Sequence, residues 1–362
     1  MPIRLKEPSK YQNSAPGLPS NYNFELSKTL GRIERLIRSN PSQATTTITL
    51  QFPDGLLQFS PVISDVILSN FDVSVTVLSD VIYGACCVDD HYESDLLIHY
   101  GHSCLINVNE MSVSVLYVFV EVAFETDHLM EMICREFVEK GSGPLSLIST
   151  VQFNSLTNGV AHAVNRIHSG SVIVPQVRPL SRGEVLGCTS PVIRTENTLY
   201  IGDGRFHLEA AMIGNRGTFY KYCPFSRRMT REEYDVTRKI ETRKKAVESF
   251  RKSESVGIVM SGLGKQGNRL LVKRVGEYIS RNMGECRVYR ISVNEVSGEV
   301  LDAYSFIDGF VQVGCPRLSI DWGESYHRPL LNPYELMGLI GDQYEMDYYS
   351  KEDVKPWGSY YG

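Results

Sequence analysis

The sequence predicts an α/β protein with mostly parallel sheets, and three observations lead to that fold class. Short apolar runs of strand length alternate with longer segments of helical period, as in βαβ units. The length of 362 residues is enough for two or three domains. Cys86, Cys188 and Cys315 each follow a small residue near the end of a strand or turn, about one small domain apart. These intervals suggest three α/β units.

The folded part is expected to open with a helix over residues 24–38, because Leu26, Leu30, Ile33 and Ile37 recur at helical spacing. Short apolar runs then predict strands at Thr45–Gln51, Val73–Leu78, Leu96–His99, Val113–Val120, Leu145–Ser149, Val172–Val174, Thr198–Ile201, Val256–Met260, Arg287–Val293 and Gly309–Val313. Helical patterns between them cover Phe59–Asn70, Asp127–Lys140, Leu156–Ser169, Arg231–Lys252, Asn268–Met283 and Asn332–Gly341.

Two further segments carry expectations of their own. The highly charged stretch Arg227–Glu254 is predicted to be an exposed helix that connects a middle domain to a last one. The segment after Glu345 is rich in tyrosine and shows no clear period, so we expect it to pack as an extended arm on the surface.

The composition excludes several classes of protein. A formal net charge of −5 excludes a generic basic nucleic-acid coat. No apolar run reaches about 18 residues, so no helix is expected to span a membrane. Residues 1–23 are polar and proline-rich, lack the apolar core of a signal peptide and are expected to form a disordered arm. We therefore expect a cytoplasmic protein whose eight cysteines stay reduced and are available for metal binding or catalysis.

Cys86, Cys188 and Cys315 are candidates for one shared site. Ligands of open α/β sheets bind beyond the carboxyl ends of the strands, so three units could aim three thiolates at a common point. Cys315 could instead be a reactive nucleophile, since Pro316 holds it extended and Arg317 beside it would favour the thiolate. A nucleophile would need a positioned histidine, and this segment has none.

A structural zinc site is a further alternative for the cysteine-rich segment of the first unit. Its spacing lacks the C-x₂-C pairs that structural zinc sites use. Adjacent cysteines on extended backbone also point in different directions. The residues that such a site could draw on are Cys86, Cys87, Cys104, His99 and His102.

One glycine-rich turn follows the strand predicted at Thr198–Ile201. Gly202, Asp203 and Gly204 precede a helix start, and such a turn can present backbone N–H groups to a carboxylate or phosphate. Asp203 and His207 are placed either to contact a ligand or to serve as turn and cap residues.

A second glycine-rich turn contains a G-x-G-x-x-G pattern at Gly262, Gly264 and Gly267, between a strand and a helix. That is the context of a dinucleotide fingerprint, so an NAD-dependent oxidoreductase is the alternative function. The acid expected about 20 residues further on is ambiguous, because Glu285 precedes the next strand instead of ending it.

Taken together, six strings identify a resemblance that covers roughly residues 25–345. In chain order they are YGACCVDD, HYGHSCL, LGCTSP, YIGDGRFHLE, LGKQG and CPRLSIDWG. The chain resembles the diphthamide biosynthesis enzyme family and, within it, subunit 1 more than its paralogue, subunit 2.

The resemblance implies an atypical radical S-adenosylmethionine enzyme. It implies three similar α/β domains arranged around a central [4Fe–4S] cluster, with one ligand from each domain: Cys86, Cys188 and Cys315. The open iron would bind S-adenosylmethionine, whose 3-amino-3-carboxypropyl group is transferred to a histidine of elongation factor 2 in the first step of diphthamide biosynthesis. The implied partners are subunit 2, in a heterodimer, and a small iron protein that delivers electrons.

The resemblance also implies a division of the chain into domains. We expect a first domain over residues 24–145 with Cys86, a second over 146–250 with Cys188, a third over 251–345 with Cys315 and a C-terminal tail over 346–362. The turns at 202–204 and 262–267 become candidate cradles for the methionine carboxylate or the adenosine of S-adenosylmethionine. Only four residues separate Asp90 from Asp95, where the family carries a longer helical crossover, which puts the local helix of the first domain in doubt but not Cys86 itself.

Overall fold

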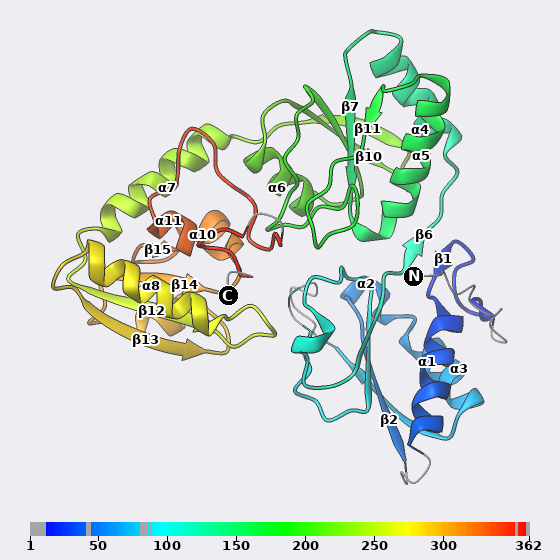
Figure 1. Cartoon of the computed structure of the whole chain (residues 1–362), viewed down its shortest axis with the longest axis horizontal. Helices are drawn as coiled ribbons and strands as arrows, with labels where there is room; N and C mark the ends of the chain where they lie inside the picture. The colour runs from blue at the N-terminus through cyan, green and yellow to red at the C-terminus, as the bar shows by residue number, and fades with distance from the viewer. Residues whose placement is uncertain (1–11, 41–44, 80–85, 87, 352–353, 360–362) are drawn as a thin grey trace. The chain divides into compact units, whose positions relative to one another are not determined.

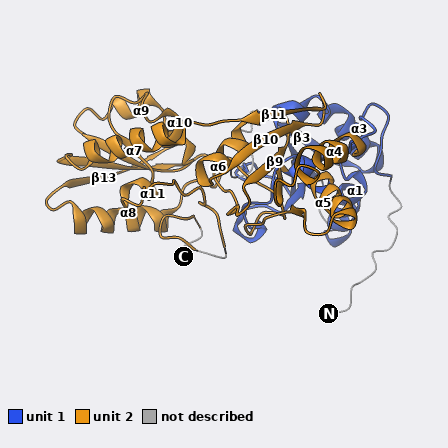
Figure 2. Ribbon diagram, turned by 90° about the horizontal axis from the view of Figure 1, so that it is seen from above, with its two compact units in different colours: residues 1–125, 151–155 blue, residues 126–150, 156–362 orange. Residues whose placement is uncertain are grey.

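The computed structural model describes residues 12–40, 45–79, 86, 88–351 and 354–359. The chain divides into two compact units, shown in different colours in Figure 2. Unit 1 comprises Met1–Glu125 and Val151–Ser155, and unit 2 comprises Thr126–Thr150 and Leu156–Gly362.

Unit 1 is built on a parallel four-stranded sheet with the order β3-β2-β4-β5. Its strands are β2 (Thr46–Gln51), β3 (Val73–Leu78), β4 (Leu96–Tyr100) and β5 (Val115–Val118). Its helices are α1 (Leu26–Ser39), α2 (Asp54–Leu57), α3 (Ser60–Asn70) and the 3₁₀ turns η1 (Val108–Glu110) and η3 (Val151–Phe153). The short strands β1 (Tyr22–Asn23) and β6 (Glu121–Val122) pair antiparallel. The apolar face of α1 is buried against the sheet, as its helical period predicts.

The first sheet of unit 2 has five strands in the order β11-β10-β9-β7-β8. They are β7 (Leu145–Ser149), β8 (Val172–Ile173), β9 (Asn197–Ile201), β10 (Thr218–Cys223) and β11 (Arg228–Glu232), and only the β10–β11 pair is antiparallel. The helices of this part are α4 (Asp127–Ile133), which continues into the π-helical turn η2 (Cys134–Val138), α5 (Asn154–Ile167) and α6 (Phe206–Gly214). Figure 1 shows α4 and α5 side by side along this sheet.

The second sheet of unit 2 is parallel, with the order β13-β12-β14-β15. Its strands are β12 (Ser255–Ser261), β13 (Arg287–Val293), β14 (Gly309–Val313) and β15 (Leu330–Leu331). The long helix α7 (Val236–Phe250) leads into it, and α8 (Arg269–Asn282), α9 (Gly298–Asp302), α10 (Arg317–Trp322) and α11 (Pro333–Leu336) follow (Figure 1).

The three larger sheets of the described chain share one strand order. In each, the first four strands in sequence lie in the order second-first-third-fourth. The chain therefore reverses direction across the sheet between the first and third strands, which is where open α/β sheets bind ligands. In each sheet the third strand is followed directly by a glycine: Gly101, Gly202 and Gly314. Each of the three sheets therefore has a candidate ligand-binding edge at the same place in its strand order.

The fold class, α/β with mostly parallel sheets, is confirmed. The strands β3, β7, β13 and β14 lie at the predicted residues, because each is a short apolar run between breakers. Among described residues 88–95, which precede β4, no helix forms. Within the described ranges, no helix has the length and apolar character that crossing a membrane would need.

Two predictions about the last third of the chain are wrong. The stretch Arg227–Glu254 is not one exposed helix, because Arg228–Glu232 forms the edge strand β11 and Arg243 of α7 is 1% exposed. The segment after Glu345 is not a surface arm either. Tyr348, Tyr349 and Trp357 are buried there, since their rings supply apolar area that unit 2 covers.

Candidate functional site

Cys188 lies in a tight turn that precedes β9. The N–H of Leu186 donates to the carbonyl of Thr189 at 2.9 Å, which closes the turn around Gly187 and Cys188. Only glycine fits at position 187, because a Cβ atom there would come within 2.0 Å of the Phe206 ring. The turn is therefore shaped by the start of α6, and the Cys188 side chain is half-buried at its tip.

Cys315 lies at the carboxyl end of β14, the third strand of its sheet. Its side chain is buried, and its carbonyl accepts a hydrogen bond of 2.9 Å from the buried side-chain amide of Gln312. Pro316 follows as the N-cap of α10, so the chain turns into a helix directly after the cysteine. Gly314 packs closely on Ser261, which ends β12. Cys315 thus sits at the edge between the first and third strands.

Arg317 joins the Cys188 turn to the Cys315 loop. Its guanidinium, 3% exposed, donates to the carbonyl of Gly187 at 3.1 Å and to that of Phe206 at 2.9 Å. It also pairs with Glu209 at 2.9 Å and with Asp321 at 2.7 Å. The sequence placed Arg317 beside a thiol, but its hydrogen bonds go to carbonyls and carboxylates. Its observed role is to fix two cysteine-bearing segments to each other.

A buried polar network lies behind these two segments. Arg243 of α7 and Glu335 of α11 form a bidentate pair at 2.6 and 2.9 Å, and both side chains are essentially unexposed. Tyr344 donates to Glu335 at 3.0 Å, and the hydroxyls of Tyr344 and Tyr348 are 3.1 Å apart. Burial raises the pKa of both tyrosines well above the usual value, so both hydroxyls stay protonated.

Cys86 lies in unit 1, between β3 and β4, and is buried. The segment that follows it is held to the sheet by Gln51, the last residue of β2, whose amide donates to the Asp89 carbonyl at 2.8 Å. The amide oxygen of Gln51 faces Nδ1 of the buried His99 at 2.9 Å. Because that oxygen can only accept, His99 carries its proton on Nδ1. Val88, two residues after Cys86, is fully buried in a cluster with Leu97 and Tyr117.

The turn at 202–204 follows β9 directly, as predicted. Asp203 is exposed, and its side chain accepts a hydrogen bond of 2.9 Å from the Gly204 N–H, so it stabilises the turn itself. His207 is half-buried in the first turn of α6. Burial, assisted by the charge of Arg317 and opposed by Asp203, lowers the pKa of His207 to about 4. His207 is therefore neutral at physiological pH.

The turn at 262–267 connects β12 to α8, also as predicted. A Cβ atom at Gly267 would come within 2.2 Å of the Ser261 carbonyl, so the backbone doubles back closely on the strand end. Gln266, buried in this turn, lies close to Gly314 with its side-chain oxygen. The turn and Cys315 thus share one edge of the same sheet.

The same geometry weakens the NAD alternative. Strands β12 and β13 are parallel, and the glycine turn follows the carboxyl end of β12. Glu285 precedes β13 and therefore lies at the opposite edge, about seven strand residues, or roughly 23 Å, away. It cannot reach a ribose bound at the turn.

The metal alternatives can be examined within the described residues. There, no three His, Cys, Asp or Glu side chains come close enough together to hold one metal ion. Of the residues considered for zinc, Cys87 lies outside the described part of the chain. His99 and His102 stack at 4.8 Å, and the Cys104 side chain is exposed. Cys86 belongs to unit 1, whereas Cys188 and Cys315 belong to unit 2.

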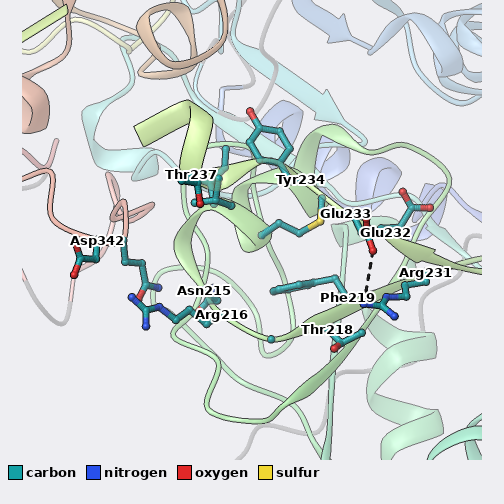
Figure 3. Close-up of a pocket in the computed structure, with 15 residues that line it drawn as sticks. Asn215, Arg216, Thr218, Phe219, Arg231, Glu232, Glu233, Tyr234, Thr237 and Asp342 are labelled. Carbon is teal, nitrogen blue, oxygen red and sulfur yellow. Dashed lines mark ion pairs between the residues drawn. The ribbon is translucent and has the colours of Figure 1, made fainter. Parts of the chain in front are cut away.

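A cavity of about 510 Å³ in unit 2 lies away from these residues (Figure 3). Its lining includes Thr218 at the start of β10, and Arg231 and Glu233, whose side chains pair at 3.6 Å. The turn at 202–204 follows the carboxyl end of β9, which is parallel to β10. The cavity is therefore at the opposite edge of the sheet from that turn.

Several residues of this arrangement were not singled out from the sequence. Gln312 is the one polar side chain in the apolar run of β14, which is a usable signal, whereas Gln51 ends a strand that also contains three threonines. Tyr344 and Tyr348 recur four residues apart, but tyrosines in an aperiodic segment carried no hint of burial. Nothing in the sequence linked Arg243 to Glu335, because 92 residues separate them.

The sequence matches a known protein family and several named relatives. The diphthamide synthesis protein family matches residues 52–350. The 2-(3-amino-3-carboxypropyl)histidine synthase subunit 1 of Encephalitozoon cuniculi is 47% identical over 347 residues, covering 95% of each chain. The protein of that name from Saccharomyces cerevisiae is 41% identical, covering 92% of this chain and 80% of its own. That from Gallus gallus is 38% identical, covering 99% and 87%.

A solved structure shares the fold. The crystal structure of Dph2 from Pyrococcus horikoshii with a 4Fe–4S cluster superposes with a TM-score of 0.73, over 92% of this chain and 97% of that one. The two sequences are 22% identical.

Proposed function

The chain belongs to the diphthamide synthesis protein family, and from that premise we propose that it is a subunit of a 2-(3-amino-3-carboxypropyl)histidine synthase. The reaction is the transfer of the 3-amino-3-carboxypropyl group of S-adenosylmethionine to a histidine of elongation factor 2. The relatives that support this are similar over nearly their whole length, and each is named as subunit 1 of such a synthase.

The cofactor is a [4Fe–4S] cluster, with Cys86, Cys188 and Cys315 as its ligands. Cysteine thiolates are the usual ligands of such clusters. The observation that carries the assignment is the buried Arg317, which bonds the carbonyl before Cys188 and belongs to the helix that follows Cys315. When bound, the cluster supplies one electron to the sulfonium of S-adenosylmethionine.

The chain's own residues then have distinct tasks. The turn at 262–267, beside Cys315, offers backbone N–H groups and the Gln266 amide to the carboxylate or adenosine of S-adenosylmethionine. The turn at 202–204 follows the third strand of the neighbouring sheet and is the second candidate cradle. His207 is neutral, and the charge of Arg317 is paired with Glu209 of α6. Neither side chain therefore adds an unpaired charge at the start of α6.

The relatives' names support an assembly of several chains, since each relative is called a subunit 1. We propose a heterodimer with subunit 2, a small iron protein as electron donor, and elongation factor 2 as the protein substrate, in the cytoplasm.

The test is a single-turnover assay with anaerobically reconstituted protein, subunit 2, a chemical reductant and elongation factor 2. S-adenosylmethionine labelled in its aminocarboxypropyl carbons should label the elongation factor, and the product should be a modified histidine. Cys188→Ala and Cys315→Ala should abolish labelling, and Cys286→Ala should not. Unlabelled elongation factor, despite a reducible cluster in the wild-type assembly, would overturn the proposed activity.

A further inference from the structure

We propose that Tyr344 and Tyr348 are positioning residues, and that residues 344–350, the C-terminal strap, hold Cys188 and Cys315 in the geometry that binds the cluster. The inference rests on the proposed function for the role of the two cysteines. It assigns a task in the site to a segment that contains none of the proposed ligands.

The strap is paired with the Cys188 turn through the backbone. The N–H of Tyr348 donates to the carbonyl of Cys188 at 3.4 Å, and the N–H of Ser190 donates to the carbonyl of Met346 at 2.8 Å. Thr189 and Asp347 form an antiparallel bridge between these two contacts. The strap thus adds a short strand beside the cysteine, on a turn that has little regular structure of its own.

The strap also reaches the Cys315 loop, through side chains. Asn332 donates to the hydroxyl of Tyr344 at 2.8 Å and to that of Ser319 at 3.0 Å. Ser319 in turn donates to the carbonyl of Pro316 at 3.1 Å, next to Cys315. One chain of hydrogen bonds therefore runs from the residue after Cys315 to the strap.

The direction of the hydrogen bonds in the strap is determined by Glu335. The carboxylate of Glu335, paired with Arg243, can only accept, so Tyr344 gives it its hydroxyl proton. Tyr348 must then be the donor in its contact with Tyr344. Each hydroxyl has one permitted orientation, and the two rings are held in a single arrangement.

Arg243 and Glu335 anchor the network, because both side chains are buried, form a bidentate pair and bond to further backbone groups. Arg243 also donates to the carbonyl of Leu330 at 2.6 Å, and Glu335 accepts from the Asn332 N–H at 3.0 Å. Breaking such a pair leaves a buried charge uncompensated. The strap is therefore bonded through Tyr344 to the Arg243–Glu335 pair and through its backbone to the Cys188 turn.

The experiment uses full-length Tyr344→Phe and Tyr348→Phe, with Tyr326→Phe as the matched control. The Tyr326 hydroxyl bonds to the Val296 carbonyl, outside the network. In the cluster-free protein, the rate of thiol alkylation at each cysteine is followed by mass spectrometry. We expect Cys188 and Cys315 to react roughly three- to tenfold faster in both strap variants, while Cys86 in unit 1 and all sites in the control keep the wild-type rates.

After reconstitution, the same variants are compared by the rate of iron loss to a chelator and by the reduction potential of the cluster. Supporting residues typically change metal affinity by about 10- to 100-fold. We expect faster iron loss and a shifted potential in the strap variants only. Wild-type alkylation rates, iron loss and potential in both strap variants would overturn the strap while leaving the proposed function intact.

The two measurements also distinguish failure of the proposed function from failure of the strap proposal. If the wild-type chain takes up no cluster but alkylation still accelerates at Cys188 and Cys315 in the variants, the strap stands as a device that positions the two thiols. The cluster assignment alone then fails.

Discussion

The two units secure their cysteines in different ways. In unit 1, the segment after Cys86 is held by Gln51, a residue of the same sheet. In unit 2, the Cys188 turn is held from outside its own sheet, by Arg317 of the helix after Cys315 and by Tyr348 of the chain end. The comparison teaches that contacts between the second and third sheets hold the Cys188 and Cys315 loops together, whereas Gln51 holds the segment after Cys86 from within its own sheet.

Among the variants that test this comparison, Arg317→Met should have the largest effect on the free energy of unfolding. The side chain is buried, and its loss removes the donor to two carbonyls and to the carboxylates of Glu209 and Asp321, of which Glu209 keeps its contact with Arg205. Because those carboxylates are partly exposed, we expect a loss of about 2–4 kcal/mol in the free energy of unfolding. Chemical denaturation of the cluster-free protein measures it. Arg281→Met, which removes only an exposed helical pair, should change it by less than about 0.5 kcal/mol.

An Arg317→Met protein as stable as the wild type, with an unchanged rate of alkylation at Cys188, would contradict the claim that Arg317 joins the Cys188 turn to the Cys315 loop.

A second variant acts on the shape of the Cys188 turn. Gly187→Ala places a methyl group against the Phe206 ring, and overpacking of this kind costs about 1–3 kcal/mol. Thermal unfolding should show the loss, and Phe206→Leu in the same chain should restore much of it by making room. Equal stability of Gly187→Ala and the double variant would show that the contact does not shape the turn.

A third variant tests the independence of unit 1. Gln51→Leu leaves the Asp89 carbonyl and the His99 Nδ1–H without this partner, at a cost of about 1–2 kcal/mol. Alkylation of the cluster-free protein should accelerate at Cys86 and stay at wild-type rates at Cys188 and Cys315. Equal acceleration at all three cysteines would remove the distinction between the two units.

The smallest effect is a pH dependence from His207. Its folded-state pKa of about 4 lies below the usual value near 6.5, so neutral His207 favours the folded chain. That stability is fully present above pH 6.5 and is lost as the pH falls toward 4. At pH 5.5 the loss is about 1.4 kcal/mol, and His207→Asn should flatten this part of the stability profile. A profile with the same slope in the variant would show that His207 does not titrate in this way.

Much of the fold could be predicted from the sequence, because strand length and helical period are local. The glycine turns could be placed for the same reason, since Gly202 directly follows an apolar run and Gly262 comes one residue after another. The edge strand β11 could not, because the charges of Arg228–Glu232 are typical of a helix surface as well as of an exposed strand.

The site divides in the same way. Cys86, Cys188 and Cys315 could be singled out by their spacing and by resemblance, but what holds them could not. Arg317 is buried by contacts with residues more than 100 positions away, and Tyr348 by contacts across the Cys188 turn. Such partners are set by the packing of whole sheets, which no local pattern encodes.

The most direct test of the central claim is the iron and sulfide content per chain after anaerobic reconstitution of Cys86→Ala, Cys188→Ala and Cys315→Ala, with Cys286→Ala beside them. If one cysteine from each sheet ligates the cluster, the wild type and Cys286→Ala should hold about four irons per chain, and each of the other three should lose most of the iron and the visible absorption. A full complement of iron in any one of the three variants would contradict the claim.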